Sequence, residues 1–266
     1  MKTEKDKISV VVVTYNSSPF ISECLKSLTS NRFSCPEIIV IDNASSDKEV
    51  CHQIAEKFPG VRFVQNEKNI GYGAALNQGA GMASGKYLFF INPDMIIPEG
   101  TTEKLSAFME SHPDCGACSP YIETPERSWL YRWLLFQMPI DVARRKIAGK
   151  YCYKVKFLLG CAIFIERAFF LKELKGFDEN FFLYYEDNDL GERIRACGKS
   201  NCVVLSASVI HFHGKSSAYL PRRKKGEILA KSRWYFAKKH NLWGLKIWYQ
   251  IYTPLQRFLC WATSWL

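Results

Sequence analysis

A polar triplet, Asn92-Pro93-Asp94, follows directly on the apolar stretch Lys86 to Ile91. A carboxylate at the end of a buried strand is suited to hold a hard divalent cation between itself and a diphosphate. A simple Pro-Asp turn explains the same residues without a ligand, and for this triplet alone it is the better explanation. The triplet therefore indicates a site only if other motifs converge on the same place.

A second cluster, Glu186, Asp187 and Asp189, lies behind the aromatic run Phe181 to Tyr185 at the start of an amphipathic segment. Acidic residues at a helix N-terminus are favoured by the helix dipole, so capping is one explanation. Aromatic neighbours would also surround the carboxylates with apolar surface and raise the basicity of one of them. A general base requires that property.

Two histidines, His211 and His213, end a late apolar stretch at alternate positions, which places both on one face of a strand. Such a pair is either structural or able to bind a metal together with a carboxylate such as Asp94. A lone CxxC, Cys115 and Cys118, has no second pair at metal spacing, and we expect the ten cysteines to be reduced core residues.

The segment Asn69 to Gly79 is a turn of small residues that enters a helix. Gly71 and Gly73 allow the backbone to approach a ligand closely, and a helix N-terminus suits an anion. Close helix-sheet packing explains the glycines equally well. It leaves Asn69 and Asn77 unexplained.

The elements that must position these residues follow an alternating pattern in the first half of the chain. Four apolar strands separated by short helices predict right-handed βαβ units in a parallel sheet. In such sheets ligands bind beyond the carboxyl ends of the strands, where this chain places its polar residues. The expected strands are 8–14, 37–41, 61–65 and 86–91, and the expected helices are 18–30, 45–58 and 73–82.

The second half is less regular. A basic, aromatic segment at 123–155 interrupts the pattern, and the tail from Arg222 is basic and amphipathic, with a single Pro254 late in it. The tail is too broken for a membrane-spanning helix and favours an interfacial one. Further helices are expected at 99–111, 167–174 and 187–196, and strands at 117–122, 157–165 and 203–212.

Six motifs in this order resemble the inverting family 2 glycosyltransferases, and among them the rhamnosyltransferase-like branch that builds bacterial O-antigen and other cell-surface polysaccharides. They are VVVTYNS, EIIVIDNASSD, NxGYxxAxNxG, NPD, GFDENFFLYYEDNDLGERIRACG and HFHGKSS. The resemblance implies the GT-A fold, a Rossmann-like, mostly parallel α/β sheet flanked by helices. We expect this domain over residues 1–217, with the basic insertion at 123–155, and a helical membrane-associating segment over 218–266.

The resemblance also implies roles for individual residues. Asp187 matches the catalytic base, while Asp94 and His211 match the side chains that bind a divalent cation, Mg²⁺ or Mn²⁺. Two positions depart from the general pattern, because Asn92 replaces the first acid of the DxD motif and Cys161 occupies a small-residue position. The residues implied to bind the donor are Thr14, Tyr15, Asn16, Asp42, Asn69, Gly71, Asn77, Asn92, Asp94 and Gly160.

The implied reaction is a single displacement that inverts the configuration of the transferred sugar. The expected donor is a nucleotide-diphosphate sugar, with dTDP-L-rhamnose preferred, and the expected acceptor is a polyprenyl-diphosphate-linked saccharide. A UDP-hexose donor is the alternative within enzymes. A non-catalytic nucleotide-binding module at a membrane surface is an alternative of another class, and the presence of Glu186-Asp187 disfavours it. An oxidoreductase is disfavoured because no GxGxxG follows the first strand.

The charge distribution indicates where the protein acts. The net charge is +10, but 127–156 holds eight basic residues and one acid, and 222–266 holds ten and one. The remainder is therefore acidic, and the basic segments are rich in aromatic residues, which favours an anionic membrane over nucleic acid. The polar N-terminus lacks a signal peptide. We expect a cytoplasmic protein, peripheral on the inner face of the bacterial membrane.

Overall fold

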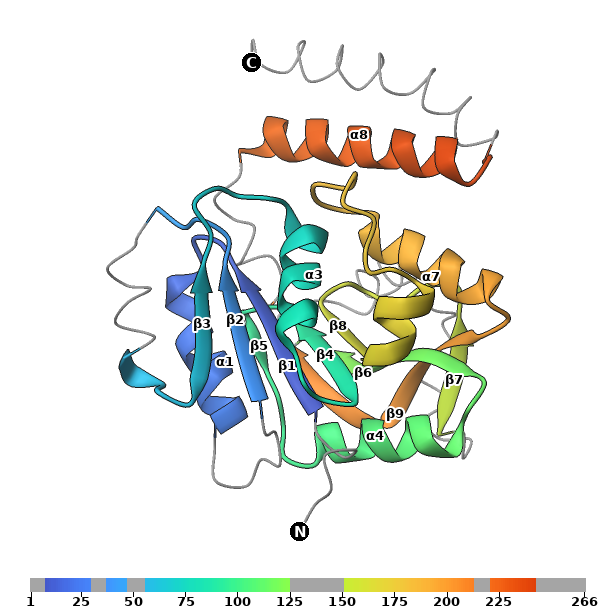
Figure 1. The fold of residues 1–266 in the computed structure, drawn as a ribbon, viewed down its shortest axis with the longest axis horizontal. Helices are drawn as coiled ribbons and strands as arrows, with labels where there is room; N and C mark the ends of the chain where they lie inside the picture. Colours follow the sequence, from blue (N-terminus) through green and yellow to red (C-terminus); the bar gives the residue numbers. More distant parts are fainter. Residues whose placement is uncertain (1–7, 30–36, 47–55, 125–150, 213–220, 243–266) are drawn as a thin grey trace.

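The computed structural model describes residues 8–29, 37–46, 56–124, 151–212 and 221–242. They form a nine-stranded sheet with helices on both faces (Figure 1). The strands are β1 Ile8–Thr14, β2 Glu37–Asp42, β3 Val61–Gln65, β4 Tyr87–Ile91, β5 Met95–Ile96, β6 Cys115–Glu123, β7 Cys152–Val155, β8 Ala162–Glu166 and β9 Ser200–His211. The helices are α1 Ser18–Thr29, α3 Tyr72–Met82, α4 Thr101–Ser111, α7 Glu186–Ala196 and α8 Arg222–Lys239, with a π-helical turn at Phe169–Glu173.

The sheet order is β3-β2-β1-β4-β8-β6-β9-β5, with β7 also paired to β9. Strands β3, β2, β1 and β4 are parallel neighbours, as the βαβ pattern predicts. The far half is mixed, because β8 runs antiparallel to β4 and β6, while β6 and β9 are parallel. The α/β class is confirmed, but the parallel order is confined to part of the sheet.

Two cores lie on opposite faces of the sheet. In β1, Val10 and Val12 pack with α1 and α4, whereas Val11 and Val13 pack with α3 and α7. The continuous apolar run of this strand is therefore explained by burial on both faces. Gly79 of α3 lies against Val11, where an added Cβ would clash. Close helix-sheet packing thus accounts for this glycine.

Several sequence-based boundaries need correction. The strand expected at 157–165 begins only at Ala162, and residues 157–161 form a loop that bonds Asn92 after β4 and Asp187 of α7. Cys152–Val155 is not part of an insertion but forms β7, paired with β9. Most of the expected helix 45–58, the bulk of the basic segment, His213 and the chain beyond residue 242 lie outside the described residues.

Helix α8 lies across one end of the domain, close to the loop that precedes α7 (Figure 1). Within the described ranges, no helix is both long enough and apolar enough to cross a membrane. The seven cysteines in these ranges are all free thiols, and Cys115 and Cys118 are buried in the core.

Candidate active site

The ends of β1 and β2 build the first wall of the site. The parallel register places Thr14 beside Asp42, and the Asn43 N–H donates to the Thr14 carbonyl at 2.8 Å. The buried Asp42 carboxylate accepts hydrogen bonds from the Ser45 N–H and from Gln65 Nε2, both at 3.2 Å. The turn after β2 and the end of β3 therefore hold this carboxylate in place.

The turn after β1 is braced against the turn after β2. Asn16 has a left-handed backbone, with φ 51°, and its N–H donates to Ser45 Oγ at 2.8 Å. Its Oδ1 accepts from the Ser46 N–H at 2.8 Å. Tyr15 is half-buried between these turns. The segment expected to hold the nucleoside is thus a defined pair of turns at the strand ends.

Asn69 and Asn77, which helix-sheet packing does not explain, both bond the backbone of neighbouring segments. Asn69 Oδ1 accepts from Asn43 Nδ2 at 2.9 Å and from the Gly71 N–H at 3.0 Å. Asn77 bonds both the N–H and the carbonyl of Phe177, at 2.7 and 2.9 Å. Both side chains therefore hold the backbone around the site through hydrogen bonds to protein.

Gly71 brings the aromatic turn before α7 onto the start of α3. Its φ of 95° is one that side-chain-bearing residues rarely adopt, and an added Cβ would lie 2.8 Å from the Phe182 carbonyl oxygen. The next residue, Tyr72, donates its N–H to the same oxygen at 2.8 Å. The first amide of α3 is therefore bonded to protein.

Tyr72 is a site residue that the motif analysis did not single out, although it stands within the quoted NxGYxxAxNxG pattern. Its hydroxyl lies 2.8 Å from Asn92 Oδ1 and 2.9 Å from the Gly160 carbonyl oxygen. Burial, together with nearby acidic groups, raises the pKa of Tyr72 well above its usual value. The phenol thus remains a neutral donor that ties β4 to the loop before β8.

Asp187 faces that same loop. Its Oδ2 accepts from the Gly160 N–H at 2.8 Å, and its Oδ1 accepts from the Asn188 N–H at 2.8 Å. A Cβ on residue 160 would lie 3.4 Å from this carboxylate, in ordinary van der Waals contact. Burial raises the pKa of Asp187 from its ordinary value, although both N–H donors oppose that shift. A purely local helix cap has no need of the contact with Gly160.

Glu186, the neighbouring acid, is 4% exposed. Burial and then the charge of Asp187 raise the pKa of Glu186 to about 8. Adjacent carboxyls, here one buried and one half-buried, resist double ionisation, so the pair retains a proton near neutral pH. The pair has the basicity that proton abstraction from a hydroxyl requires.

The third acid, Asp189, has a different environment. It is fully buried, and its Oδ2 pairs with Arg193 Nε at 2.7 Å. Its Oδ1 lies 2.8 Å from His240 Nε2 and 2.7 Å from Lys239 Nζ, both at the end of α8. Asp189 is thus engaged in ion pairs with these side chains. Glu186 and Asp187 are therefore the acids suited to proton transfer.

Asp94 and His211 come together because β5 and β9 are antiparallel, with Met95 opposite His211. The Phe212 N–H donates to the Asp94 carbonyl at 3.0 Å, and His211 Nε2 lies 3.2 Å from Asp94 Oδ1. Burial lowers the pKa of His211, but neighbouring Cys161 and Asp94 raise it more, to about 10. The sequence missed this short strand, yet it correctly paired the two residues.

The donor types at this point suit a divalent cation. A carboxylate with an imidazole is a common set for such ions. No group of three or more metal-ligating side chains is arranged for an ion within the part of the chain that the structure describes. Asp94 and His211 therefore fit a cation whose other ligands come from a diphosphate and water, as is usual for Mg²⁺.

A helix-flanked mixed sheet whose strand ends converge on buried carboxylates is the GT-A glycosyltransferase architecture. The fold resembles S. aureus TarS in complex with UDP-GlcNAc, with TM-score 0.61 and 23% identity, covering 86% of this chain and 66% of that one. It also resembles GalNAc-T7 solved with UDP, GalNAc and Mn²⁺, with TM-score 0.64 and 19% identity, covering 79% and 44% of the chains.

The chain belongs to glycosyl transferase family 2, whose sequence model matches residues 9–173. A Mycobacterium tuberculosis protein named N-acetylglucosaminyl-diphospho-decaprenol L-rhamnosyltransferase is 27% identical, over 90% of this chain and 86% of its own length. The protein is thus a glycosyltransferase, as the motifs predict. This assignment excludes the oxidoreductase and the non-catalytic module that were considered as alternatives.

Proposed function

We propose that this glycosyltransferase moves L-rhamnose from dTDP-L-rhamnose to a saccharide carried on a polyprenyl diphosphate, with inversion at the anomeric carbon. The reaction belongs to the synthesis of a bacterial cell-surface polysaccharide, such as an O-antigen. The name of the mycobacterial relative supports both the sugar and the lipid-linked acceptor. The observation that carries the proposal is the half-buried Asp187 carboxylate, which accepts a hydrogen bond at 2.8 Å from the Gly160 N–H in the loop before β8.

In the proposed reaction Asp187 accepts the proton of an acceptor hydroxyl. The oxygen then forms a bond to the anomeric carbon on the face opposite the nucleotide, while the bond from that carbon to the diphosphate oxygen breaks. Proton abstraction by a positioned carboxylate contributes roughly 10²- to 10⁴-fold to such reactions. A divalent cation bound between Asp94, His211 and the diphosphate would neutralise the leaving group.

The donor is held by the walls described above. We propose that the turns of Thr14 to Asn16 and the Asp42 carboxylate bind the base and ribose. Asn92 and Gly160, which share the Tyr72 hydroxyl, border the sugar and the diphosphate. Asn69, Gly71 and Asn77 contribute by shaping the cradle.

The proposed location is the cytoplasmic face of the bacterial membrane, where a polyprenyl-linked acceptor is found. Helix α8 carries eight basic residues and one acid. Lys224, Lys231 and Lys238 recur every seven residues, which places them on one exposed stripe beside Trp234. Basic side chains with an aromatic at their edge favour an anionic lipid surface.

A donor panel tests this function. The protein is incubated with dTDP-L-rhamnose, UDP-glucose, UDP-GlcNAc and UDP-galactose, each with a polyprenyl-diphosphate-GlcNAc acceptor, and product is detected by mass spectrometry. We expect transfer from dTDP-L-rhamnose with Mg²⁺ or Mn²⁺ and little in excess chelator. A preference for a UDP-hexose would contradict the assignment of dTDP-L-rhamnose as donor. Full activity in excess chelator would show that transfer needs no divalent cation.

A further inference from the structure

Helix α8 docks on the segment that carries the catalytic acids. Ser232 Oγ donates to the Leu183 carbonyl at 2.8 Å. The Tyr235 ring packs on Phe181 with centroids 4.8 Å apart, and the Phe236 ring packs on Tyr185 at 5.3 Å. One face of α8 therefore covers the aromatic turn just before Glu186.

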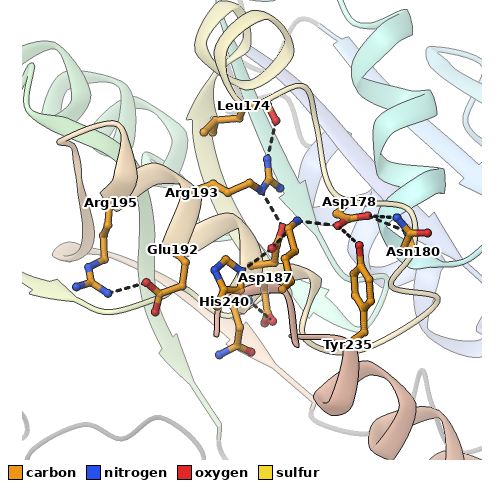
Figure 2. Close-up of polar contacts among 12 residues, drawn as sticks. Leu174, Asp178, Asn180, Asp187, Glu192, Arg193, Arg195, Tyr235 and His240 are labelled. Carbon is orange, nitrogen blue, oxygen red and sulfur yellow. Dashed lines mark hydrogen bonds and ion pairs between the residues drawn. The ribbon is translucent and has the colours of Figure 1, made fainter. Parts of the chain in front are cut away.

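Charged contacts close the same interface at both ends of that segment. Asp178 Oδ2 accepts from the Tyr235 hydroxyl at 3.0 Å (Figure 2). The same oxygen pairs with Lys239 Nζ at 2.6 Å. Lys239 Nζ also lies 2.7 Å from Asp189 Oδ1, and His240 Nε2 lies 2.8 Å from the same oxygen. A single ammonium thus spans the two ends of the loop that contains Asp187.

Between those two anchor points the backbone is strained. Tyr184 and Tyr185 are consecutive and left-handed, with φ 70° and 71°. Aromatic residues rarely adopt this conformation, and it persists only where the surroundings determine it. The surroundings here are Gly71 on one side, through the Phe182 carbonyl, and α8 on the other.

We propose that α8 is a positioning element of the active site, in which Lys239, Tyr235 and His240 hold the strained turn so that Asp187 faces Gly160. These are positioning residues, since none of them contacts the strand ends where the reaction occurs. The inference rests on the proposed role of Asp187 as the base. It makes the C-terminal helix part of the catalytic apparatus and not only an attachment to a membrane.

The test compares Lys239→Met with Lys86→Met. Lys86 forms one ion pair, with Glu110 at 3.3 Å, where Lys239 forms two, and its side chain is 35% exposed against 28% for Lys239. Lys86 precedes β4, at the strand end opposite the site. We expect Lys239→Met to lower kcat for transfer about tenfold or more, as small misplacements of a reacting group do, with the donor KM within about twofold. Lys239→Arg should restore most of kcat, and Lys86→Met should leave both constants unchanged.

Tyr235→Phe provides a milder variant that removes one hydrogen bond to Asp178, and we expect a smaller fall in kcat at an unchanged melting temperature. Hydrogen exchange of residues 181–190 is measured on the same proteins and should be faster in Lys239→Met alone. An unchanged kcat, or equal falls in kcat for the two methionine variants, would overturn the inference. If the wild-type enzyme transfers no sugar from any donor, the proposed function fails. Independently of that result, an unchanged hydrogen-exchange rate of residues 181–190 in Lys239→Met would overturn the positioning role of α8.

Discussion

Glu186 and Asp187 behave as one titrating unit at the scale of single residues. Burial raises the pKa of both, that of Glu186 to about 8. The apparent pKa values of such a pair belong to the pair and to neither residue alone. The proposed function therefore places proton transfer on a pair of carboxyls whose ionisation the folded protein disfavours.

That burial predicts a pH dependence of stability. A carboxyl with a higher pKa in the folded protein than its ordinary 4.5 binds its proton more tightly when folded. The contribution of this carboxyl to the free energy of unfolding is therefore fully present below about pH 4.5 and is lost as the pH rises through about 8. We expect the free energy of unfolding to decline over this range in wild type and to decline less in Glu186→Gln. Urea titrations at several pH values measure this, and equal slopes would contradict it.

The cation site makes a second residue-level prediction. Asp94→Ala and His211→Ala should sharply weaken Mn²⁺ binding measured by calorimetry in the presence of dTDP, because each removes a proposed ligand. His213→Ala, two residues away, serves as the matched control and should have a much smaller effect. Equal losses for the two histidine variants would show that the ligand is wrongly assigned.

At the scale of elements, the start of α3 controls how closely the acidic turn approaches. Gly71→Ala places a methyl group 2.8 Å from the Phe182 carbonyl and requires φ near 95° from alanine. We expect a loss of about 1–3 kcal/mol in the free energy of unfolding, together with lower transfer activity.

Gly81→Ala on the same helix is the control, because an added Cβ there meets nothing within 4 Å. This change should be neutral or slightly stabilising, by up to about 1 kcal/mol, since alanine is the better helix former. Thermal and urea unfolding of both variants give the comparison. A Gly71→Ala protein as stable and active as Gly81→Ala would argue against the tight contact.

The elements that could be predicted from sequence are those whose signal is local. Ile8–Thr14 reads as a buried strand because its side chains are apolar on both faces. Met95–Ile96 is too short for any pattern, and it is a strand only because β9 lies beside it. Phe157 to Cys161 is apolar enough for a strand but forms a loop, in which the Gly160 N–H bonds the distant Asp187. The motifs located the acids, whereas the docking of α8 depends on contacts between distant residues and had no local signal.

At the scale of the whole molecule, α8 has two faces with different tasks. Its inner face holds the acidic turn, and its outer stripe of Lys224, Lys231 and Lys238 is exposed with Trp234 at 36%. If the acceptor is membrane-bound, as proposed, this stripe would keep the site near the bilayer.

We expect the protein to sediment with anionic phosphatidylglycerol vesicles and to be released by high salt. Replacing Lys231 and Lys238 with glutamine should lower the affinity by about 2 kcal/mol, since each basic residue contributes about 1 kcal/mol near such a surface. The same replacements at Lys104 and Lys172, exposed on α4 and on the π-helical turn, provide the control. Equal binding of wild type to neutral phosphatidylcholine vesicles would contradict the electrostatic attraction.

The measurement that bears most directly on the whole account is the transfer rate of Asp187→Asn. Asparagine keeps the size of the side chain but cannot take a proton, so the rate should fall about 10²-fold or more. The affinity for dTDP should barely change, because the proposed nucleotide and cation contacts lie elsewhere. The melting temperature should fall modestly, because an amide can accept only one of the two N–H bonds that the Asp187 carboxylate accepts. Near-normal turnover in Asp187→Asn, with activity abolished in Glu186→Gln, would contradict the account and move the base to Glu186.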